Sequence, residues 1–172
     1  MKDEFFPLVD DAGNIIGKAS RSECHSGSFL LHPVVHLHVL NSKGELFLQK
    51  RASTKDIQPD KWDTAVGGHV DYGESIYEAL SREVREELGI TVFTPVFIAY
   101  YKYTSDIESE FVHSFYAVYD GRIFPDPVEI SEGRFWSFEE ITAQIGKGIF
   151  TPNFEYELKH LLHNRLFGCS EK

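Results

Sequence analysis

Residues 68–90 read GHVDYGESIYEALSREVREELGI, and this stretch decides the fold. Its opening glycines are incompatible with a regular helix, so the first residues predict a loop. Over residues 74–88, apolar residues recur at steps of three and four, and most positions between them are charged, which predicts an amphipathic helix. Gly89 follows at a place where helices often end in a left-handed residue. We therefore expect a loop, a helix and a second loop.

Acidic side chains are concentrated in the second half of this helix, in the segment REVREELG. At about 100° per residue, Glu83, Glu86 and Glu87 project toward one face of the helix. Like charges at this spacing repel each other, and a divalent cation with oxygen ligands would turn the repulsion into attraction. For an isolated pair of glutamates, a solvated acidic surface would be the better interpretation. The surrounding pattern favours a magnesium or manganese site instead.

That surrounding pattern resembles the Nudix box, Gly-x5-Glu-x7-Arg-Glu-aliphatic-x-Glu-Glu-x-Gly-aliphatic, at every fixed position of residues 68–90. The resemblance implies an α/β (α+β) fold, namely an α/β/α sandwich with a mixed sheet and a loop–helix–loop motif. It also implies a metal-dependent pyrophosphohydrolase, which cleaves a phosphoric anhydride bond in a nucleoside di- or triphosphate or a related organic diphosphate. Its cofactor would be Mg²⁺ or Mn²⁺, held by Glu83, Glu86 and Glu87.

The resemblance further implies roles for single residues of the box. Gly68 would let the backbone approach the substrate, and Arg82 would pair within the box to orient a glutamate. We expect the catalytic residues to be Glu83, Glu86 and Arg82. Glu83 is the first candidate for the general base, and acids on later loops are rivals.

A second resemblance, to isopentenyl-diphosphate isomerases, extends over most of the chain. Residues 38–75, HVLNSKGELFLQKRASTKDIQPDKWDTAVGGHVDYGES, are similar to the corresponding isomerase region. The isomerases hold a further metal ion with histidines and a Glu-x-Glu pair. The resemblance implies a second site for Mn²⁺, Mg²⁺ or Zn²⁺ with the ligands His25, His32, His69, Glu108 and Glu110.

Residue 67 departs from the isomerase pattern. The isomerases carry a thiol directly before the glycine of the loop, where it exchanges protons with the allylic carbons, and this chain has Gly67 there. Conversely, the box is degenerate in the isomerases and complete here. We therefore expect a hydrolase. The alternatives are an isomerase acting on a prenyl diphosphate and a non-catalytic, ligand-sensing Nudix domain.

Cationic side chains near the box are candidates for substrate binding. Arg51 and Lys55 offer groups that complement phosphoryl oxygens, and with Gly68 they form our expected substrate-binding set. Pairing with surface acids is the alternative for both cations. His36 and His38 share a strand face by alternation, and lining that face is favoured over metal binding.

The rest of the chain predicts strands and two further helices around the motif. Hairpins are expected over residues 6–16 and over residues 34–40 and 45–51, with a loop over 52–60. Further strands are expected over 92–103, 111–119 and 134–138, and helices over 138–145 and 153–166.

Length and composition exclude several classes of protein. The 172 residues predict one domain, residues 1–172, with residues 1–30 as an N-terminal hairpin and arm. A net charge of −10 disfavours a nucleic-acid polymer as partner, so a small-molecule diphosphate is expected. No apolar run approaches the roughly 18 residues of a membrane span, and the N-terminal residues do not resemble a secretory signal. We expect no membrane association and a cytoplasmic location.

Two further expectations concern cysteines and assembly. Cys24 and Cys169 are too few for a disulfide scaffold, although one bridge between them stays open. Cys24 does not occupy the thiol position of the isomerases. Many Nudix enzymes are dimers, so the resemblance also allows a homodimer.

Overall fold

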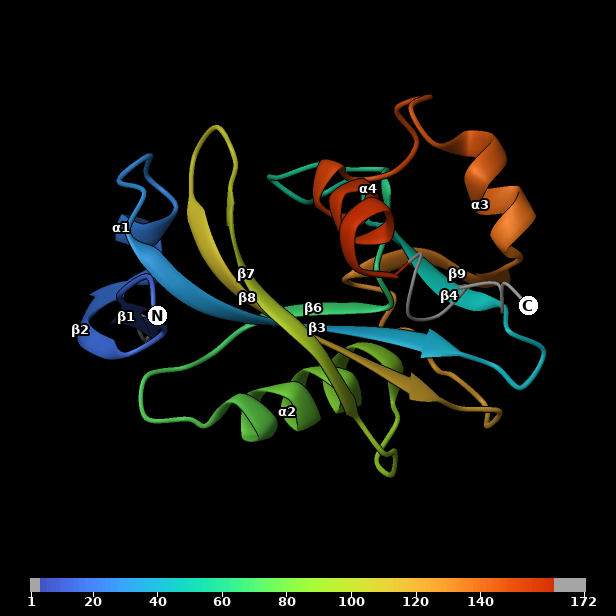
Figure 1. Ribbon diagram of the computed structural model, residues 1–172, viewed down its shortest axis with the longest axis horizontal. Helices are drawn as coiled ribbons and strands as arrows, with labels where there is room; N and C mark the ends of the chain where they lie inside the picture. Colours follow the sequence, from blue (N-terminus) through green and yellow to red (C-terminus); the bar gives the residue numbers. More distant parts are fainter. Residues whose placement is uncertain (1–3, 163–172) are drawn as a thin grey trace, which may run out of the picture.

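A mixed β-sheet lies between helices in the computed structural model, which describes residues 4–162 (Figure 1). The strand order is β5 (Trp62–Asp63), β4 (Leu46–Arg51), β3 (Leu31–Leu40), β8 (Ser109–Val118), β7 (Val96–Thr104). In addition, β6 (Val66–His69) pairs with β3, and β9 (Ile130–Trp136) pairs with β4. β3 and β8 are parallel, and the other pairings of this sheet are antiparallel. The expected α/β fold with a mixed sheet is confirmed.

Helices cover both faces of the sheet because its strands alternate their apolar side chains (Figure 1). On β3, Val35, Leu37 and Val39 point into the core beneath helix α2 (Ile76–Leu88). On β4, Leu46 and Leu48 point into the opposite core, which also contains residues of α3 (Phe138–Gln144) and α4 (Pro152–Glu157). Strands β3 and β4 therefore lie between the two cores and contribute side chains to both.

Helix α2 begins two residues later than the sequence pattern predicts. Ser75 is the N-cap, where its hydroxyl accepts a hydrogen bond from the backbone N–H of Glu78 and its own N–H donates to the Glu78 carboxylate. Glu74 therefore belongs to the preceding loop. The helix ends as expected, with Gly89 at a φ of 67°.

Two short strands and one short helix were missed in the sequence. β5 has two residues and β6 has four, including Gly67 and Gly68, so neither gives an alternating pattern that is long enough to recognise. Helix α1 (Arg21–Cys24) has four residues and follows the N-terminal hairpin of β1 (Phe5–Val9) and β2 (Ile15–Ser20).

The hairpin expected over 34–40 and 45–51 forms only near its turn. Val39 pairs with Phe47 and Leu40 with Leu46, whereas the earlier part of β3 pairs with β6. The strand expected over 134–138 is β9 and begins at Ile130.

The last expected helix, residues 153–166, is shorter in its α-helical part. It consists of α4 followed by a π-helical segment, Leu158–Leu162, and residues 163–166 lie outside the described part of the chain.

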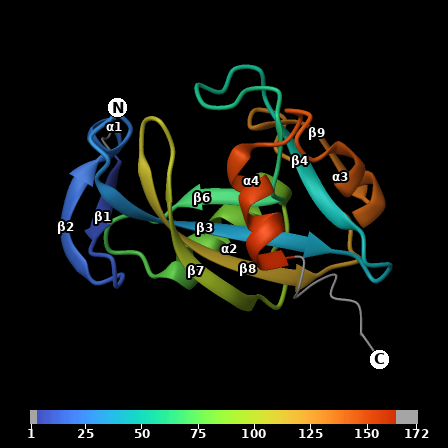
Figure 2. The same ribbon diagram turned by 45° about the horizontal axis from the view of Figure 1, so that its top comes forward.

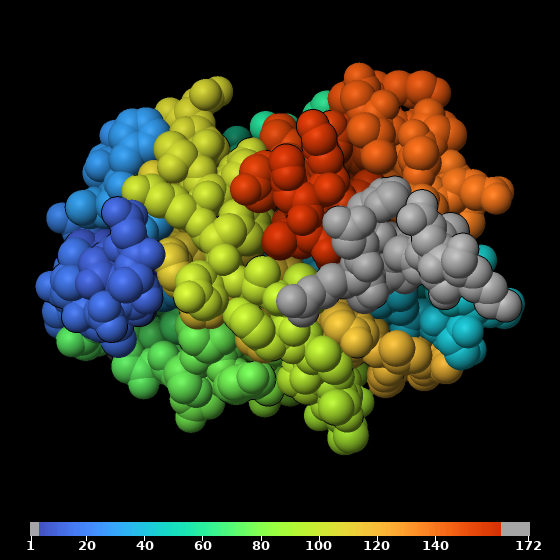
Figure 3. Space-filling model, in the orientation of Figure 1, coloured from blue at the N-terminus to red at the C-terminus, as the bar shows by residue number. Residues whose placement is uncertain are grey.

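Figure 2 shows the N-terminal hairpin and α1 at one end of the molecule and α3 at the other. Figure 3 shows the same arrangement with all atoms drawn. Within residues 4–162, no helix has the length and apolar character that a membrane span requires.

Candidate active site

The side chain of Glu83 lies where a side chain of residue 68 would otherwise be. A Cβ atom built on Gly68 would lie 2.1 Å from Cδ and 2.4 Å from Cγ of Glu83, far closer than two carbon atoms can approach. The carboxylate of α2 can therefore lie against the end of β6 only because residue 68 has no side chain. The glycine of the box is required by this contact.

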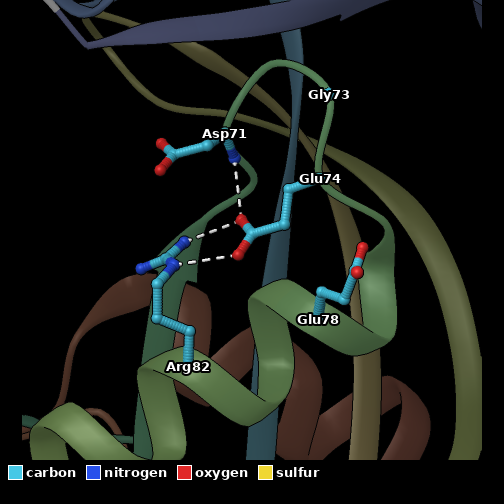
Figure 4. Close-up of a pocket in the computed structure, with 5 residues that line it drawn as sticks. All are labelled: Asp71, Gly73, Glu74, Glu78 and Arg82. Atoms are coloured by element: carbon cyan, nitrogen blue, oxygen red, sulfur yellow. Dashed lines mark hydrogen bonds and ion pairs between the residues drawn. The ribbon is translucent and has the colours of Figure 1, made fainter.

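Arg82 connects Glu74 in the loop before α2 with Glu83 of the helix, and Figure 4 shows its contact with Glu74. Its Nε and Nη2 donate to the two carboxylate oxygens of Glu74, each over 2.9 Å, and Nη2 also donates to the carbonyl oxygen of His69 over 3.0 Å. Its Nη1 donates to Oε1 of Glu83 over 2.7 Å. Arg82 thus holds Glu83 in place through charge-assisted hydrogen bonds.

The pocket drawn in Figure 4 lies at the start of α2 and is lined by Asp71, Gly73, Glu74, Glu78 and Arg82. The carboxylate of Glu74 fills its centre, because the backbone N–H of Asp71 donates to it from one side and Arg82 from the other. Glu78 points away from this pair toward the N-cap. Glu74 thus anchors the loop, because its carboxylate accepts hydrogen bonds from the backbone of Asp71 and from Arg82.

The three glutamates expected to bind metal have different environments. Burial raises the pKa of Glu87 to about 8, although Gln49 donates a hydrogen bond of 2.7 Å to its Oε2 and opposes the rise. Burial also raises the pKa of Glu83, against the effect of Arg82. The side chain of Glu86 is 54% exposed. Glu83 and Glu87 face the sheet, and Glu86 lies at the rim beside solvent.

The expected substrate-binding cations both have acidic partners. Arg51 donates to the carbonyl oxygen of Ile57 over 3.0 Å and pairs with Asp63 over 3.4 Å. Lys55 forms an ion pair with Glu129. The charge of Lys55 lowers the pKa of Glu87, which places this cation within electrostatic reach of the box.

Three histidines and one glutamate converge at the C-terminal end of β6, where His69 directly follows Gly68. Their ligand atoms all lie within 4.8 Å of one another, and this is the one group of that kind within residues 4–162: His25, His32, His69 and Glu108. Nε2 of His25 lies 3.1 Å from Nε2 of His69 and 3.2 Å from Oε2 of Glu108. The structure therefore gathers four of the five side chains expected for the second metal site.

Two atoms of this cluster are buried without a hydrogen bond, Nε2 of His32 and Oε2 of Glu108. Nδ1 of His32 lies 2.8 Å from the carbonyl oxygen of Leu30, and its N–H donates there. The lone pair of Nε2 is therefore directed into the cluster. Unpaired buried polar atoms are costly, and a cation between them would remove the cost.

The electrostatics of the histidines also fit a metal site. Burial, with Arg21 and His32, lowers the pKa of His25 to about 4, and burial together with neighbouring histidines holds the pKa of His69 well below its usual value. Neutral imidazole is the form that binds metals. Phe6 of β1 stacks on His69 with a centroid distance of 4.4 Å, so the N-terminal hairpin orients that ring.

Glu110 lies outside the group of four. It faces His32 in the parallel register of β3 and β8, and burial, reinforced by the charge of Glu108, raises its pKa to about 7. It is thus next to the cluster, on the face of the sheet that α4 covers.

A buried carboxylate on α4, which the sequence pattern did not indicate, organises His36 and His38 of β3. Glu157 is fully buried, and it accepts hydrogen bonds from Nδ1 of His36 over 2.9 Å, from Nε2 of His38 and from the hydroxyl of Tyr101 over 2.7 Å. Although burial alone would raise the pKa of Glu157, His38 and His36 hold it well below its usual range. One signal was available, since an acid interrupts the apolar stripe of Phe154 and Leu158.

We expect Glu157→Gln to lower the free energy of unfolding by about 3–5 kcal/mol near pH 6, because the substitution leaves a buried imidazolium without its carboxylate partner. Glu157 raises the pKa of His36 from 6.5 to about 9, against the effect of burial. The ion pair therefore makes its full contribution to the stability of the fold below pH 6.5, and this contribution is lost as the pH rises through 9. Because the pKa of Glu157 is lowered, its ionised carboxylate contributes fully to stability at every pH above 4.5, the ordinary pKa of a glutamate.

Urea unfolding at several pH values measures this effect. The difference between wild type and Glu157→Gln should be largest between pH 4.5 and 6.5 and should narrow toward pH 9. Glu155→Gln on the same helix serves as the control. A difference that stays constant from pH 6 to 9 would refute the assignment of a charged pair.

Comparison with known proteins identifies the family. A sequence model described as the NUDIX domain matches residues 30–154. The chain belongs to the Nudix family. Among relatives of this Nudix protein, isopentenyl-diphosphate Delta-isomerase 1 of Photorhabdus laumondii is 30% identical over 165 residues, 91% of this chain and 94% of the relative. A protein of Yersinia pestis that is named an uncharacterized Nudix hydrolase is 31% identical, over 87% of this chain and 81% of the relative.

Solved structures resemble this Nudix protein in fold. The protein DR0079 of Deinococcus radiodurans has a TM-score of 0.77 at 24% identity and covers 91% of this chain and 98% of its own. A MutT protein of Methanosarcina mazei has a TM-score of 0.66 at 24% identity, over 75% of this chain and 91% of its own. These likenesses confirm the Nudix fold. The relatives include both hydrolases and isomerases, so the choice between these reactions rests on the site.

Proposed function

We propose that this Nudix protein is a metal-dependent pyrophosphohydrolase that cleaves a diphosphate bond in a nucleoside di- or triphosphate or a related organic diphosphate. The observation that carries the proposal is the complete box on α2. Gly68 makes room for Glu83, Arg82 fixes that carboxylate, and Glu87 lies buried one turn further along the same helix. Such a set of carboxylates suits Mg²⁺ or Mn²⁺.

Each residue of the box has a separate part in the proposed reaction. Glu83, Glu86 and Glu87 would hold the cation, which activates water and neutralises charge on the phosphoryl oxygens when it is bound. Arg82 is a positioning residue, because its guanidinium contacts Glu74 and Glu83. Glu83 is the first candidate for the general base, since burial raises its pKa above that of a free carboxyl. Lys55 and Arg51 would contact the diphosphate after exchanging their present carboxylate partners.

Phosphorus NMR of the purified protein with Mg²⁺, and then with Mn²⁺, tests the reaction on a panel of nucleoside di- and triphosphates and their conjugates. The proposal expects new signals of monophosphate or inorganic phosphate that need the metal and the protein. If the whole panel stays intact with both metals, the hydrolase proposal fails, and a non-catalytic ligand-sensing domain becomes the better account.

Replacement of Gly68 by alanine should lower kcat about 10- to 100-fold, because the new Cβ would overlap Cδ of Glu83 and displace a carboxylate of the box. Gly67→Ala is the matched control for folding of β6, since a Cβ there meets its nearest neighbour at an ordinary 3.5 Å. Circular dichroism of both variants and kcat on the best substrate give the comparison. Full activity of Gly68→Ala would show that Glu83 need not occupy this position.

We also propose that His25, His32, His69 and Glu108 form a second metal site, with Glu110 as a neighbouring carboxylate. Three imidazole nitrogens and one carboxylate oxygen are a donor set suited to Zn²⁺ or Mn²⁺. The unpaired buried atoms of His32 and Glu108 support this site. Its metal would lie on the side of β6 that faces α4, apart from the box glutamates.

Prenyl diphosphate isomerisation is the second candidate function, and the histidine cluster together with the isomerase relatives favours it. Gly67 opposes it, because the position that carries the thiol in isomerases has no side chain. Proton NMR of isopentenyl diphosphate incubated with the protein decides the matter. The hydrolase proposal expects the double bond to stay in place, and a shifted double bond would establish the isomerase.

A further inference from the structure

Gln49 is a buried polar residue on the face of β4 that helix α2 covers. Because side chains alternate along a strand, Gln49 shares this face with Phe47, which belongs to the core beneath the helix. The side chain of Gln49 is 7% exposed. A buried amide requires hydrogen-bond partners, since each unpaired N–H group costs free energy. The partners of Gln49 therefore indicate what an amide does at this position.

The amide nitrogen of Gln49 holds two parts of the molecule together. Nε2 donates to the carbonyl oxygen of Ala65 over 3.0 Å and to Oε2 of Glu87 over 2.7 Å. Because both partner atoms are acceptors, they fix which end of the amide is the nitrogen. Ala65 lies between β5 and β6, and Glu87 lies on α2. Gln49 thus connects α2 with the segment that leads into β6 and its Gly68.

The carboxylates of the box differ in what holds them. Arg82 donates to Glu83 over 2.7 Å and pairs with Glu86 over 3.5 Å, so these two glutamates have a partner within the box. The partner of Glu87 comes from outside the box. Gln49 engages Oε2 of Glu87, and within residues 4–162 no hydrogen bond engages the other oxygen, Oε1. A carboxylate that is held through one oxygen keeps the lone pairs of the other for a cation.

We propose that Gln49 is a positioning residue of the metal site, whose amide holds the carboxylate of Glu87 in the orientation that binds the divalent cation. The inference rests on the proposed function, because it takes the box glutamates as ligands of Mg²⁺ or Mn²⁺. Hydrogen bonds to a ligating carboxylate orient it, and their loss typically weakens metal binding about 10- to 100-fold. Gln49 lies 38 residues before Glu87, so the spacing of the box does not reveal it.

Two variants separate the contact with Glu87 from the stability of the fold. Methionine has nearly the length of glutamine and donates no hydrogen bond, so we expect Gln49→Met to raise the Kd of Mn²⁺ at the box about ten-fold. Thr64→Val is the matched control, since Thr64 is buried next to Ala65 and its hydroxyl bonds to His38. This control should lower the midpoint of urea unfolding and leave Kd within about two-fold of wild type.

A double-mutant cycle separates a role through Glu87 from a general loosening of the site. Glu87→Gln alone should weaken Mn²⁺ binding, because it removes the charge of a ligand. If Gln49 acts through that carboxylate, Gln49→Met in the Glu87→Gln background should change Kd by no more than about two-fold. A general structural effect would instead lower the affinity by the same factor in both backgrounds.

Electron paramagnetic resonance measures the binding, because the signal of free Mn²⁺ loses intensity when the protein binds the ion. The histidine cluster is the same in all variants, so the comparison concerns the Mn²⁺ site that Glu87→Gln weakens. Wild-type affinity in Gln49→Met, or additive effects of Gln49→Met and Glu87→Gln, would overturn the positioning role and leave the metal site of the box in place.

Two further outcomes concern the proposed function. If Glu87→Gln binds Mn²⁺ as wild type does, Glu87 is not a ligand, and both the positioning role and the proposed metal site of the box fail. If the cycle has the expected form while no nucleotide of the panel is hydrolysed, the role of Gln49 stands and the hydrolase proposal fails.

Discussion

Glu86→Gln and Glu87→Gln should each lower kcat/KM by about 10³-fold, the largest effect expected for any single change in this protein. A cation at the phosphoryl group contributes several kcal/mol to catalysis, and each factor of ten in rate corresponds to about 1.4 kcal/mol. Glutamine has nearly the size of glutamate and lacks the charge that holds a divalent cation. The loss should therefore appear in turnover rather than in folding.

The environments of the two glutamates support retention of the fold. Glu86 is half-exposed, so its replacement disturbs little packing. Glu87 is buried beside Gln49, and a glutamine at position 87 can accept the same hydrogen bond through its amide oxygen. Glu78→Gln is the matched control, since Glu78 lies on the same helix and serves in the N-cap. Steady-state kinetics and urea unfolding of all three variants give the comparison, and wild-type turnover in either of the first two would place the metal elsewhere.

The second large effect concerns metal content. A His32→Ala, His69→Ala double variant should lose one bound metal ion per chain, because half of the ligands in the group of four are removed. Elemental analysis of the dialysed protein by mass spectrometry measures the loss. His113→Ala is a suitable control, since it removes a partly buried imidazole outside the cluster. A double variant with the metal complement of wild type would exclude this cluster as a metal site.

The sequence predicted the parts of the fold that depend on local pattern. The spacing of Leu80, Val84 and Leu88 predicted α2, and Gly89 marked its end. Ser75 and Glu78 form a capping box, and this local signal places the start of the helix two residues later than the apolar spacing does. The short strands β5 and β6 were missed because their pairing depends on contacts with β4 and β3, which are remote in the chain.

The candidate site likewise contains residues that the local sequence pattern predicts and residues that only the fold brings together. The box glutamates lie on one helix, so periodicity alone places them on neighbouring turns. The histidine cluster draws its members from β3, β6, the residue after α1 and the residue before β8, and only the resemblance to isomerases suggested it. Glu157 could not be assigned a partner from the sequence, because its contacts with β3 cross more than half of the chain. Within the described residues Cys24 is buried and free, and Cys169, with which a bridge was left open, lies outside them.

The most direct test of the hydrolase is phosphorus NMR of turnover in ¹⁸O-labelled water, with Mg²⁺ and the best substrate of the nucleotide panel. The account predicts cleavage of the diphosphate bond with one ¹⁸O atom in a phosphate product, which appears as an isotope shift of that product's signal. Without Mg²⁺ and Mn²⁺, the protein should cleave no diphosphate bond. Product without ¹⁸O, or no product with any diphosphate of the panel, would contradict it.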